Sequence, residues 1–213
     1  MPASLPPLIL ASTSRYRREL LQRLRLPFHV VAPGVDETPL PGEAPLALAL
    51  RLARAKAAAV AQRHPDAIVI GSDQVALCAG EVLGKPGSHS QALAQLRRMA
   101  GQTAVFHSAL AVQHGARVAS LSVPTHCRLR PLTETQLEAY LRADQPYDTA
   151  GSAKAEALGI ALMQEIRSDD PTALIGLPLI ALTSLLADFG LDPLDALAAA
   201  PQTPPPHQPG AAA

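Results

Sequence analysis

The first half of the chain alternates short apolar runs with segments that have helical spacing. Residues 8–11 and 28–32 are short apolar runs, and residues 67–77 form a longer one, which is typical of buried strands. Between them, residues 15–24 and 46–63 repeat apolar side chains at the three- and four-residue spacing of a helix. This alternation predicts an α/β domain.

The second half of the chain predicts a hairpin followed by further helices. Residues 104–113 and 117–130 alternate apolar and polar positions and are separated by His114-Gly115-Ala116, which predicts two antiparallel strands. Thr133 opens another helix, with Gln136 placed to complete a capping box. The remaining predictions are a helix at 90–100, a polar loop at 151–159, a strand at 160–166 and a helix at 178–189. We therefore expect a mixed, twisted sheet flanked by helices.

Length and composition favour one domain with an added tail. Residues 1–191 suffice for one core, and aromatic side chains make up only 3% of the chain, so that core must consist of Leu, Val, Ile and Ala. From residue 192 onward the chain is rich in Ala and Pro. Pro204-Pro205-Pro206 fits neither a helix nor a sheet interior, so we expect residues 192–213 to be a disordered tail.

Charge and cysteine content argue against several classes of function. Eighteen basic residues balance eighteen acidic ones, so no global field attracts nucleic acid or an anionic membrane. The apolar stretches are too short to span a bilayer, and the N-terminus lacks the features of a signal peptide. Cys78 and Cys127 have no metal-type spacing, which favours free thiols in a reducing compartment. We expect a cytoplasmic protein with neither nucleic acid nor membrane as partner.

Lysine is rare, and each lysine falls in a segment that resembles a site. Only Lys56, Lys85 and Lys154 occur among the eighteen basic residues, and the rest are Arg. An ammonium is a compact point charge that fits among phosphate oxygens, whereas a guanidinium is planar and forked. The alternative is chance in an Arg-biased composition.

The first candidate site is the junction between the strand at 8–11 and the helix that follows. Ser12 and Ser14 lie where free backbone N–H groups and the helix dipole favour an anion. Arg17 and Arg18 add charged donors one turn later. The alternative is an ordinary capped helix with two surface arginines.

The second candidate is an acidic residue in the apolar run at 67–77. The run turns polar at Gly71-Ser72-Asp73-Gln74, and a strand that ends there places Asp73 at the carboxyl edge of a sheet, where ligands bind in open α/β folds. A buried carboxylate needs a cation, a hydrogen bond or a catalytic task. Asp73 is therefore our candidate general base, and a capping Asp in a tight turn is the alternative.

Three further segments add charge to this picture. Asp36-Glu37 offers carboxylates that suit a hard divalent cation, although such pairs are usually solvated. Lys56 interrupts an apolar helical row, where it either snorkels to water or reaches a buried anion. Gly84-Lys85-Pro86 is a rigid turn that presents one lysine and lacks the pattern of a P-loop. Together these features predict metal-assisted hydrolysis or transfer at a phosphate.

The order of these motifs resembles the Maf family of nucleoside triphosphate pyrophosphatases. The resemblance extends from Leu8 to Gly190, and seven short motifs in order carry it: Leu8-Ile9-Leu10-Ala11-Ser12-Thr13-Ser14, Arg17-Arg18, Asp36-Glu37, Lys56, Gly71-Ser72-Asp73-Gln74, Gly84-Lys85-Pro86 and Ile175-Gly176-Leu177-Pro178.

The resemblance implies a fold, a reaction and residue roles. It implies two lobes around a nucleotide cleft, and cleavage between the α- and β-phosphates with a divalent metal, Mg²⁺ or Mn²⁺. It makes Asp73 the general base and a metal ligand, and Glu37 a carboxylate that binds the metal or positions the water. It makes Ser12, Arg17, Lys56 and Lys85 triphosphate contacts, to which we add Ser14 and Arg18 from the same segment. A homodimer is a further expectation from the family.

Three positions bear on the base of the nucleotide. Family members that act on dTTP and UTP typically have Arg, Thr and Gln at these positions. This chain has Tyr16, Gln74 and Glu156, which is similar to the branch that hydrolyses N7-methyl-GTP. N7-methylguanine is cationic, so an aromatic face and a carboxylate both favour it; the aromatic contribution is about 0.5–2 kcal/mol. Without the resemblance, we would interpret Tyr16 and Glu156 as surface residues.

The chain also departs from the family pattern. Arg15 stands where the family often has Pro, and Ala153 replaces a position that is often aromatic in this branch. For Lys154, a phosphate contact and a base-side contact are both open alternatives. Two alternatives remain open: the same chemistry on dTTP or UTP, and a nucleotide-binding regulator of cell division.

Overall fold

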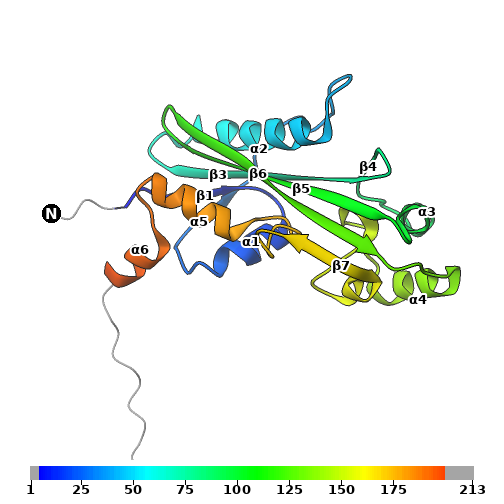
Figure 1. Cartoon of the computed structure of the whole chain (residues 1–213). Helices are drawn as coiled ribbons and strands as arrows, with labels where there is room; N and C mark the ends of the chain where they lie inside the picture. The colour runs from blue at the N-terminus through cyan, green and yellow to red at the C-terminus, as the bar shows by residue number, and fades with distance from the viewer. Residues whose placement is uncertain (1–4, 200–213) are drawn as a thin grey trace, which may run out of the picture.

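The computed structural model describes residues 5–199, which contain a seven-stranded mixed sheet (Figure 1). The sheet order is β2-β1-β3-β5-β6-β7, with β4 paired to β3. The strands are β1 (Leu8–Ala11), β2 (His29–Val31), β3 (Ile68–Cys78), β4 (Glu81–Leu83), β5 (Thr103–His114), β6 (Arg117–Leu129) and β7 (Met163–Ser168). β1 pairs in parallel with β2 and β3, whereas β3, β5, β6 and β7 pair antiparallel. The predicted mixed sheet and the β5–β6 hairpin are confirmed.

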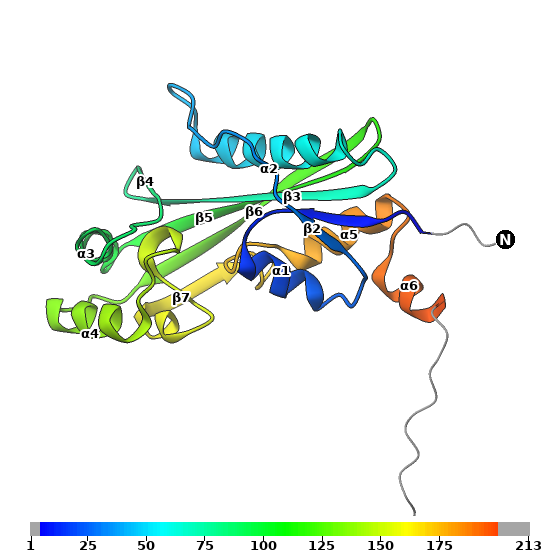
Figure 2. The same cartoon turned by 180° about the vertical axis from the view of Figure 1, so that it is seen from behind.

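Helices cover both faces of the sheet and one of its ends, as Figures 1 and 2 show from opposite sides. α2 lies on one face, α1 and α5 lie on the other, and α3 and α4 lie at the end that carries β4 and β7. The helices are α1 (Arg15–Gln22), α2 (Pro45–Ala61), α3 (His89–Met99), α4 (Glu134–Asp144), α5 (Leu179–Asp188) and α6 (Pro193–Ala199), with 3₁₀ turns η1 (Ala150–Ser152) and η2 (Leu158–Leu162).

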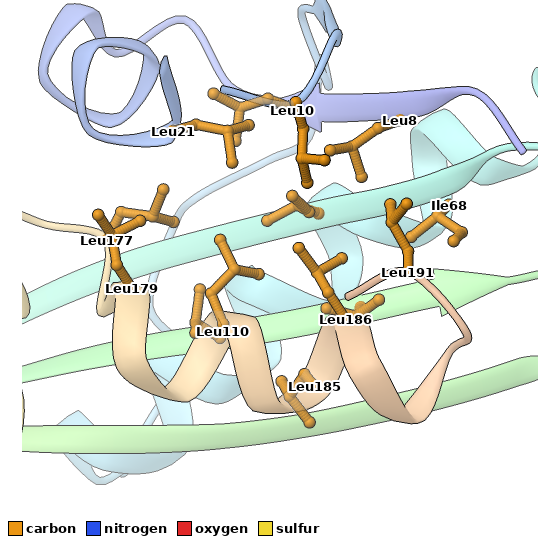
Figure 3. Packing of buried hydrophobic residues seen from close by; sticks show 14 of the residues in the cluster. Leu8, Leu10, Leu21, Ile68, Leu110, Leu177, Leu179, Leu185, Leu186 and Leu191 are labelled. Atoms are coloured by element: carbon orange, nitrogen blue, oxygen red, sulfur yellow. The ribbon is translucent and has the colours of Figure 1, made fainter. Parts of the chain in front are cut away.

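The core between the sheet and α1 and α5 is almost entirely aliphatic (Figure 3). Leu10 and Ile68 from the strands meet Leu21 of α1 and Leu186 of α5, and all four side chains are fully buried or nearly so. Burying one such side chain contributes about 1.5–3 kcal/mol. The expectation of a core of Leu, Ile, Val and Ala is confirmed.

A separate core lies between α3 and α4 at the far end of the sheet. Leu93 and Leu96 of α3 pack with Leu137, Tyr140 and Leu141 of α4. The predicted capping box at the start of α4 is present, since the Thr133 hydroxyl accepts from the Gln136 backbone and the Gln136 side chain accepts from the Thr133 backbone. This packing forms the second lobe that the family resemblance implies.

Two predicted segments differ from the structure. The strand predicted at 160–166 begins only at Met163, because residues 158–162 form η2, whose 3₁₀ hydrogen bonds replace sheet pairing. The tail predicted from residue 192 is helical over α6, whose first residue, Pro193, is buried. Residues 200–213 lie outside the described residues, so the prediction of disorder there is not tested.

Both cysteine side chains are buried in the core of the protein. Cys78 and Cys127 are free and buried, and burial raises the pKa of the Cys127 thiol to about 12. Among residues 5–199, no helix combines the length and hydropathy needed to cross a membrane.

Candidate active site

The candidate site lies beside β3, at a gap between the two strands, β1 and β4, that pair with the same side of it. β1 pairs with β3 up to Gly71, and β4 pairs with it from Ala76 onward, so residues 72–75 pair only with β5. β1 leads directly into Ser12 at this gap. The antiparallel direction of β4 carries the chain after Leu83 back toward the same gap. Three predicted motifs, at the ends of β1 and β4 and in the middle of β3, therefore converge here.

Asp73 lies within β3 and not at its end, which corrects the expectation from the sequence. β3 continues to Cys78 because its pairing with β5 extends along its whole polar segment. Its parallel partner β1 does stop at Ala11, opposite Gly71, so Asp73 still lies just beyond the carboxyl end of a neighbouring strand. The tight-turn alternative for Asp73 is wrong.

Asp73, Lys56 and Glu37 meet in what we call the Lys56 cluster. The Lys56 Nζ donates to Asp73 Oδ1 at 2.7 Å and lies 2.7 Å from Glu37 Oε1. Lys56 is 4% exposed and Asp73 is 7% exposed, whereas the Glu37 side chain is 59% exposed. Lys56 therefore does not snorkel to water. It joins a buried carboxylate to one that faces solvent.

A glycine allows this contact between α2 and β3. Gly71 and Asp73 lie two positions apart on β3 and so face the same side, toward α2. A Cβ on Gly71 would lie 2.1 Å from the Ala53 carbonyl oxygen and 2.7 Å from the Ala57 backbone nitrogen. The absence of this atom lets α2 approach closely enough for Lys56 to reach Asp73.

Arg17 extends from the first turn of α1 toward the same cluster. Its Nε donates to the Gly176 carbonyl at 3.0 Å, and the Ser72 hydroxyl donates to the same oxygen at 3.1 Å. Gly176 has φ +118°, a conformation that L side chains rarely adopt. Burial lowers the pKa of Arg17, while the carboxylates of Asp73 and Glu37 oppose that effect, so the guanidinium lies within their electrostatic reach.

The other predicted phosphate contacts are two serines, which hydrogen-bond at the start of α1, and two exposed cations. Ser14 caps α1 by accepting from the Arg17 backbone N–H, and Ser12 accepts from the Ser14 N–H, so both hydroxyls already serve the helix start. Arg18 and Lys85 are exposed and form no ion pair within residues 5–199. Their contact with phosphate stays a prediction.

Sequence reasoning missed the ion pair that fixes the loop carrying Glu37. Arg51 donates to both oxygens of Glu43, at 2.6 and 2.8 Å, and to the Thr38 carbonyl at 3.1 Å. This bidentate pair lowers the pKa of Glu43 to about 2. Asp36 does not join the Lys56 cluster; its carboxylate closes a turn with the Thr38 N–H. No local motif marks Arg51 or Glu43.

A second feature is a cavity of about 330 Å³ between α1 and the second lobe, which we call the Tyr16 cavity. The Tyr16 hydroxyl donates to Asp148 Oδ2 at 3.3 Å, and Lys154 Nζ lies 3.0 Å from Asp148 Oδ1. The Arg15 guanidinium lies 5.1 Å from the centre of the Tyr16 ring. The cavity is lined by Arg15, Tyr16, Glu19, Leu20, Arg23, Asp144, Lys154, Glu156, Ala157 and Ile175.

The cavity thus contains two of the three residues predicted for the base, Tyr16 and Glu156, but not Gln74. The Gln74 amide donates to the Ser108 hydroxyl at 2.9 Å and to the Leu174 carbonyl at 3.0 Å. It faces away from Asp73 because neighbouring residues on a strand point to opposite sides. Its influence on the base stays a prediction, and its bonds to the Ala173 and Leu174 carbonyls connect it to the segment that includes Ile175 of the cavity lining.

The Lys56 cluster suits a small hard cation. Lys56 contacts one oxygen of Asp73 and one of Glu37, so each carboxylate keeps an oxygen that Lys56 does not use. The part of the chain that the structure describes holds no group of three or more His, Cys, Asp or Glu arranged around a metal position. Mg²⁺ is commonly held by one or two carboxylates with water and substrate phosphates, so these residues fit such an ion.

A buried carboxylate paired with a lysine, beside the unpaired segment of β3 and the basic start of α1, is suited to phosphate chemistry. The comparisons agree: residues 7–189 match the family described as Maf-like protein, and the chain belongs to the Maf family. It is similar to the 7-methyl-GTP pyrophosphatase of Bordetella pertussis, with 65% identity over 91% of this chain and 98% of the relative. The protein of the same name from Thiobacillus denitrificans is 62% identical over 89% and 95%.

Proposed function

We propose that this chain hydrolyses N7-methyl-GTP to N7-methyl-GMP and pyrophosphate, and so removes a modified nucleotide. The observation that carries the reaction is the Lys56 cluster, in which the buried Asp73 is fixed by Lys56 beside an unpaired strand edge. The choice of base is supported by Tyr16 and Glu156, which line one cavity, and by relatives named 7-methyl-GTP pyrophosphatase.

Asp73 acts as the general base in this proposal. A water molecule attacks the α-phosphorus, a bond forms between the water oxygen and phosphorus, and the bond to the bridging oxygen of the β-phosphate breaks. Pyrophosphate leaves with that oxygen, and the proton of the water passes to Asp73 and then to solvent. The hydrogen bond from Lys56 keeps the Asp73 carboxylate in one orientation for this task.

Cations around the gap in β3 hold the triphosphate. Arg17 stands at the start of α1, where the backbone of Ser12 and Ser14 adds donors and the helix dipole favours an anion. Lys85 follows β4 on the other side of the gap, and Arg18 adds charge at the rim. A divalent cation, Mg²⁺ or Mn²⁺, held by Asp73 and Glu37 would offset phosphate charge when bound.

The base enters the Tyr16 cavity. The Tyr16 ring offers an aromatic face to the cationic N7-methylguanine, and the exposed Glu156 carboxylate accepts from the base N–H groups. Gln74 acts indirectly, through the 173–174 carbonyls that it holds. The cytoplasmic location and the homodimer expected from the sequence stay predictions.

Identification of the products tests the reaction itself. Purified protein is incubated with N7-methyl-GTP and Mg²⁺, and the products are separated by ion-exchange chromatography and followed by ³¹P NMR. We expect N7-methyl-GMP and pyrophosphate in equal amounts, formed about 10²–10⁴-fold more slowly by Asp73→Asn. Release of N7-methyl-GDP and inorganic phosphate would contradict cleavage between the α- and β-phosphates.

A further inference from the structure

Lys154 has no place in the phosphate chemistry, yet its side chain belongs to the Tyr16 cavity. It lines that cavity beside Tyr16 and Glu156, and its side chain is only 16% exposed. A lysine beside the ring that receives a cationic base should oppose binding of that base. The structure supplies a partner for it, since Asp148 lies 3.0 Å from Lys154 Nζ and also accepts from the Tyr16 hydroxyl.

The backbone holds Lys154 firmly in this position. Its N–H donates to the Tyr140 hydroxyl at 3.2 Å, and a Cβ on Gly159 would lie 2.5 Å from the Lys154 carbonyl oxygen. The preceding turn uses positive φ at both Gly151 and Ser152, and the Ser152 hydroxyl donates to the Gln95 side chain at 2.6 Å. The position of Lys154 is thus set by packing on both sides, which distinguishes it from a freely mobile surface lysine.

Both members of the pair are ionised near neutral pH. Burial alone would raise the pKa of Asp148, but the hydrogen bond and charge of Lys154 outweigh burial and leave that pKa below its ordinary value. Burial alone would lower the pKa of Lys154, but Asp148 and then Tyr16 outweigh it and leave that pKa above its ordinary value. Asp148 and Lys154 therefore form a neutral pair of two charges.

The charged residues that line the cavity, which do not include Asp148, sum to zero net charge. Arg15, Arg23 and Lys154 are the lining cations, and Glu19, Asp144 and Glu156 are the lining carboxylates. Arg15 and Glu19 already pair with each other at 3.5 Å. Asp148, behind Lys154, adds the negative charge that leaves the surroundings of Tyr16 net negative.

We propose that the Asp148–Lys154 pair determines base selectivity: Asp148 neutralises Lys154 and orients Tyr16, so that the Glu156 carboxylate remains free for a cationic base. This inference rests on the proposed function and extends it to two residues outside the three base positions of the family. Without Asp148, Lys154 would be an uncompensated cation beside the ring and would be free to pair with Glu156 instead.

The test compares kcat/KM for N7-methyl-GTP with kcat/KM for GTP, because the two substrates differ by the methyl group and its charge. Asp148→Asn keeps an oxygen that accepts from Tyr16 and removes only the charge, so we expect the ratio to fall about tenfold. Lys154→Met leaves Asp148 negative, so the ratio should stay at the wild-type value or rise. The double variant restores one net negative charge, so its ratio should return to within about threefold of wild type.

A merely structural role for the pair predicts a different pattern. In that case both single variants lower the ratio and the double variant does not recover it, which would overturn the proposal. An unchanged ratio in Asp148→Asn would overturn it too. Glu165→Gln breaks the exposed pair with Arg167 on β7 and is the matched control, whose ratio should equal that of wild type. A wild-type enzyme without preference for N7-methyl-GTP would instead refute the proposed function, and this ratio is measured first.

Discussion

The Lys56 cluster and the Tyr16 cavity differ in how the fold holds them. Lys56 and Asp73 come from the buried faces of α2 and β3, and are 4% and 7% exposed. Around Tyr16, the Asp148 side chain is 61% exposed, and Glu156, in the segment between η1 and η2, is exposed. Lys56 and Asp73 of the first region belong to the core, and only Glu37 comes from a loop, whereas the second region is built from a helix surface and a loop.

In the proposed function, this difference separates the residues of the reaction from the residues that select the base. A change in the Lys56 cluster disturbs core packing and buried charge together, so turnover and stability should both fall. A change in the Tyr16 cavity alters groups that solvent already reaches, where the fold tolerates substitution. The same catalytic scaffold can therefore be combined with different base pockets at little cost in stability.

The largest expected effect is that of Asp73→Asn. Asn can still accept from Lys56 but cannot take a proton from water, so kcat should fall by about 10²–10⁴-fold. Circular dichroism and nucleotide affinity should stay close to those of wild type. Turnover within threefold of wild type would exclude Asp73 as the general base.

Next in size is the effect of Lys56→Met on stability. It leaves the Asp73 carboxylate buried without a cation, which costs about 3–5 kcal/mol, measured as the free energy of unfolding in urea. The double variant with Asp73→Asn has no buried charge and should recover part of that loss. If the double variant is no more stable than Lys56→Met, buried charge is not the cause.

Gly71→Ala tests the close contact between α2 and β3. The new Cβ would clash with the Ala53 carbonyl, so α2 must move away, at a cost of about 1–3 kcal/mol or more in stability. Turnover should fall with it, because Lys56 moves away from Asp73. Gly84→Ala, where a Cβ meets nothing within 4 Å, is the control for stability.

A smaller effect is expected from changes in the Tyr16 cavity. Tyr16→Ala combined with Glu156→Gln removes the aromatic face and the carboxylate. The preference for N7-methyl-GTP over GTP should fall by roughly 2- to 30-fold, the range of one cation–π contact. The melting temperature should move by only a few degrees. An unchanged preference would show that the base binds elsewhere.

The smallest effect concerns the loop that presents Glu37. The pKa of Glu43 lies near 2, below its ordinary value of 4.5, because Arg51 hydrogen-bonds its ionised form. The stability from this pair is present above pH 4.5 and is lost as the pH falls toward 2. Glu43→Gln should therefore differ most from wild type near neutrality, and the two unfolding curves should converge in acid. A constant difference down to pH 2 would contradict the pair.

The sequence predicted the members of the Lys56 cluster but not their arrangement. Spacing identified Lys56 and Asp73 as unusual charges in apolar surroundings, whereas their contact depends on the β1–β3 register and on Gly71. Gln74 entered the predicted site through the family resemblance, as a position that bears on the base, and the resemblance does not show which way its side chain points. In a strand that continues, alternation places Gln74 and Asp73 on opposite faces.

The Tyr16 cavity was harder to predict because its contacts join distant parts of the chain. Tyr16 and Asp148 lie 132 positions apart, and neither belongs to a motif that names the other. Asp148 follows α4 in a segment without regular spacing. Only the packing of the second lobe against α1 brings it beside Tyr16 and Lys154.

The most direct test of the central claim is a comparison of pyrophosphate release from N7-methyl-GTP, GTP, dTTP and UTP by the wild-type protein with Mg²⁺ or Mn²⁺. We predict that kcat/KM is highest for N7-methyl-GTP and that Asp73→Asn slows release from all four by about 10²–10⁴-fold. A preference for dTTP or UTP would retain the Lys56 cluster and contradict the Tyr16 cavity as a site for a cationic base. Binding without release from any of the four would contradict the catalytic proposal and favour a nucleotide-binding regulator.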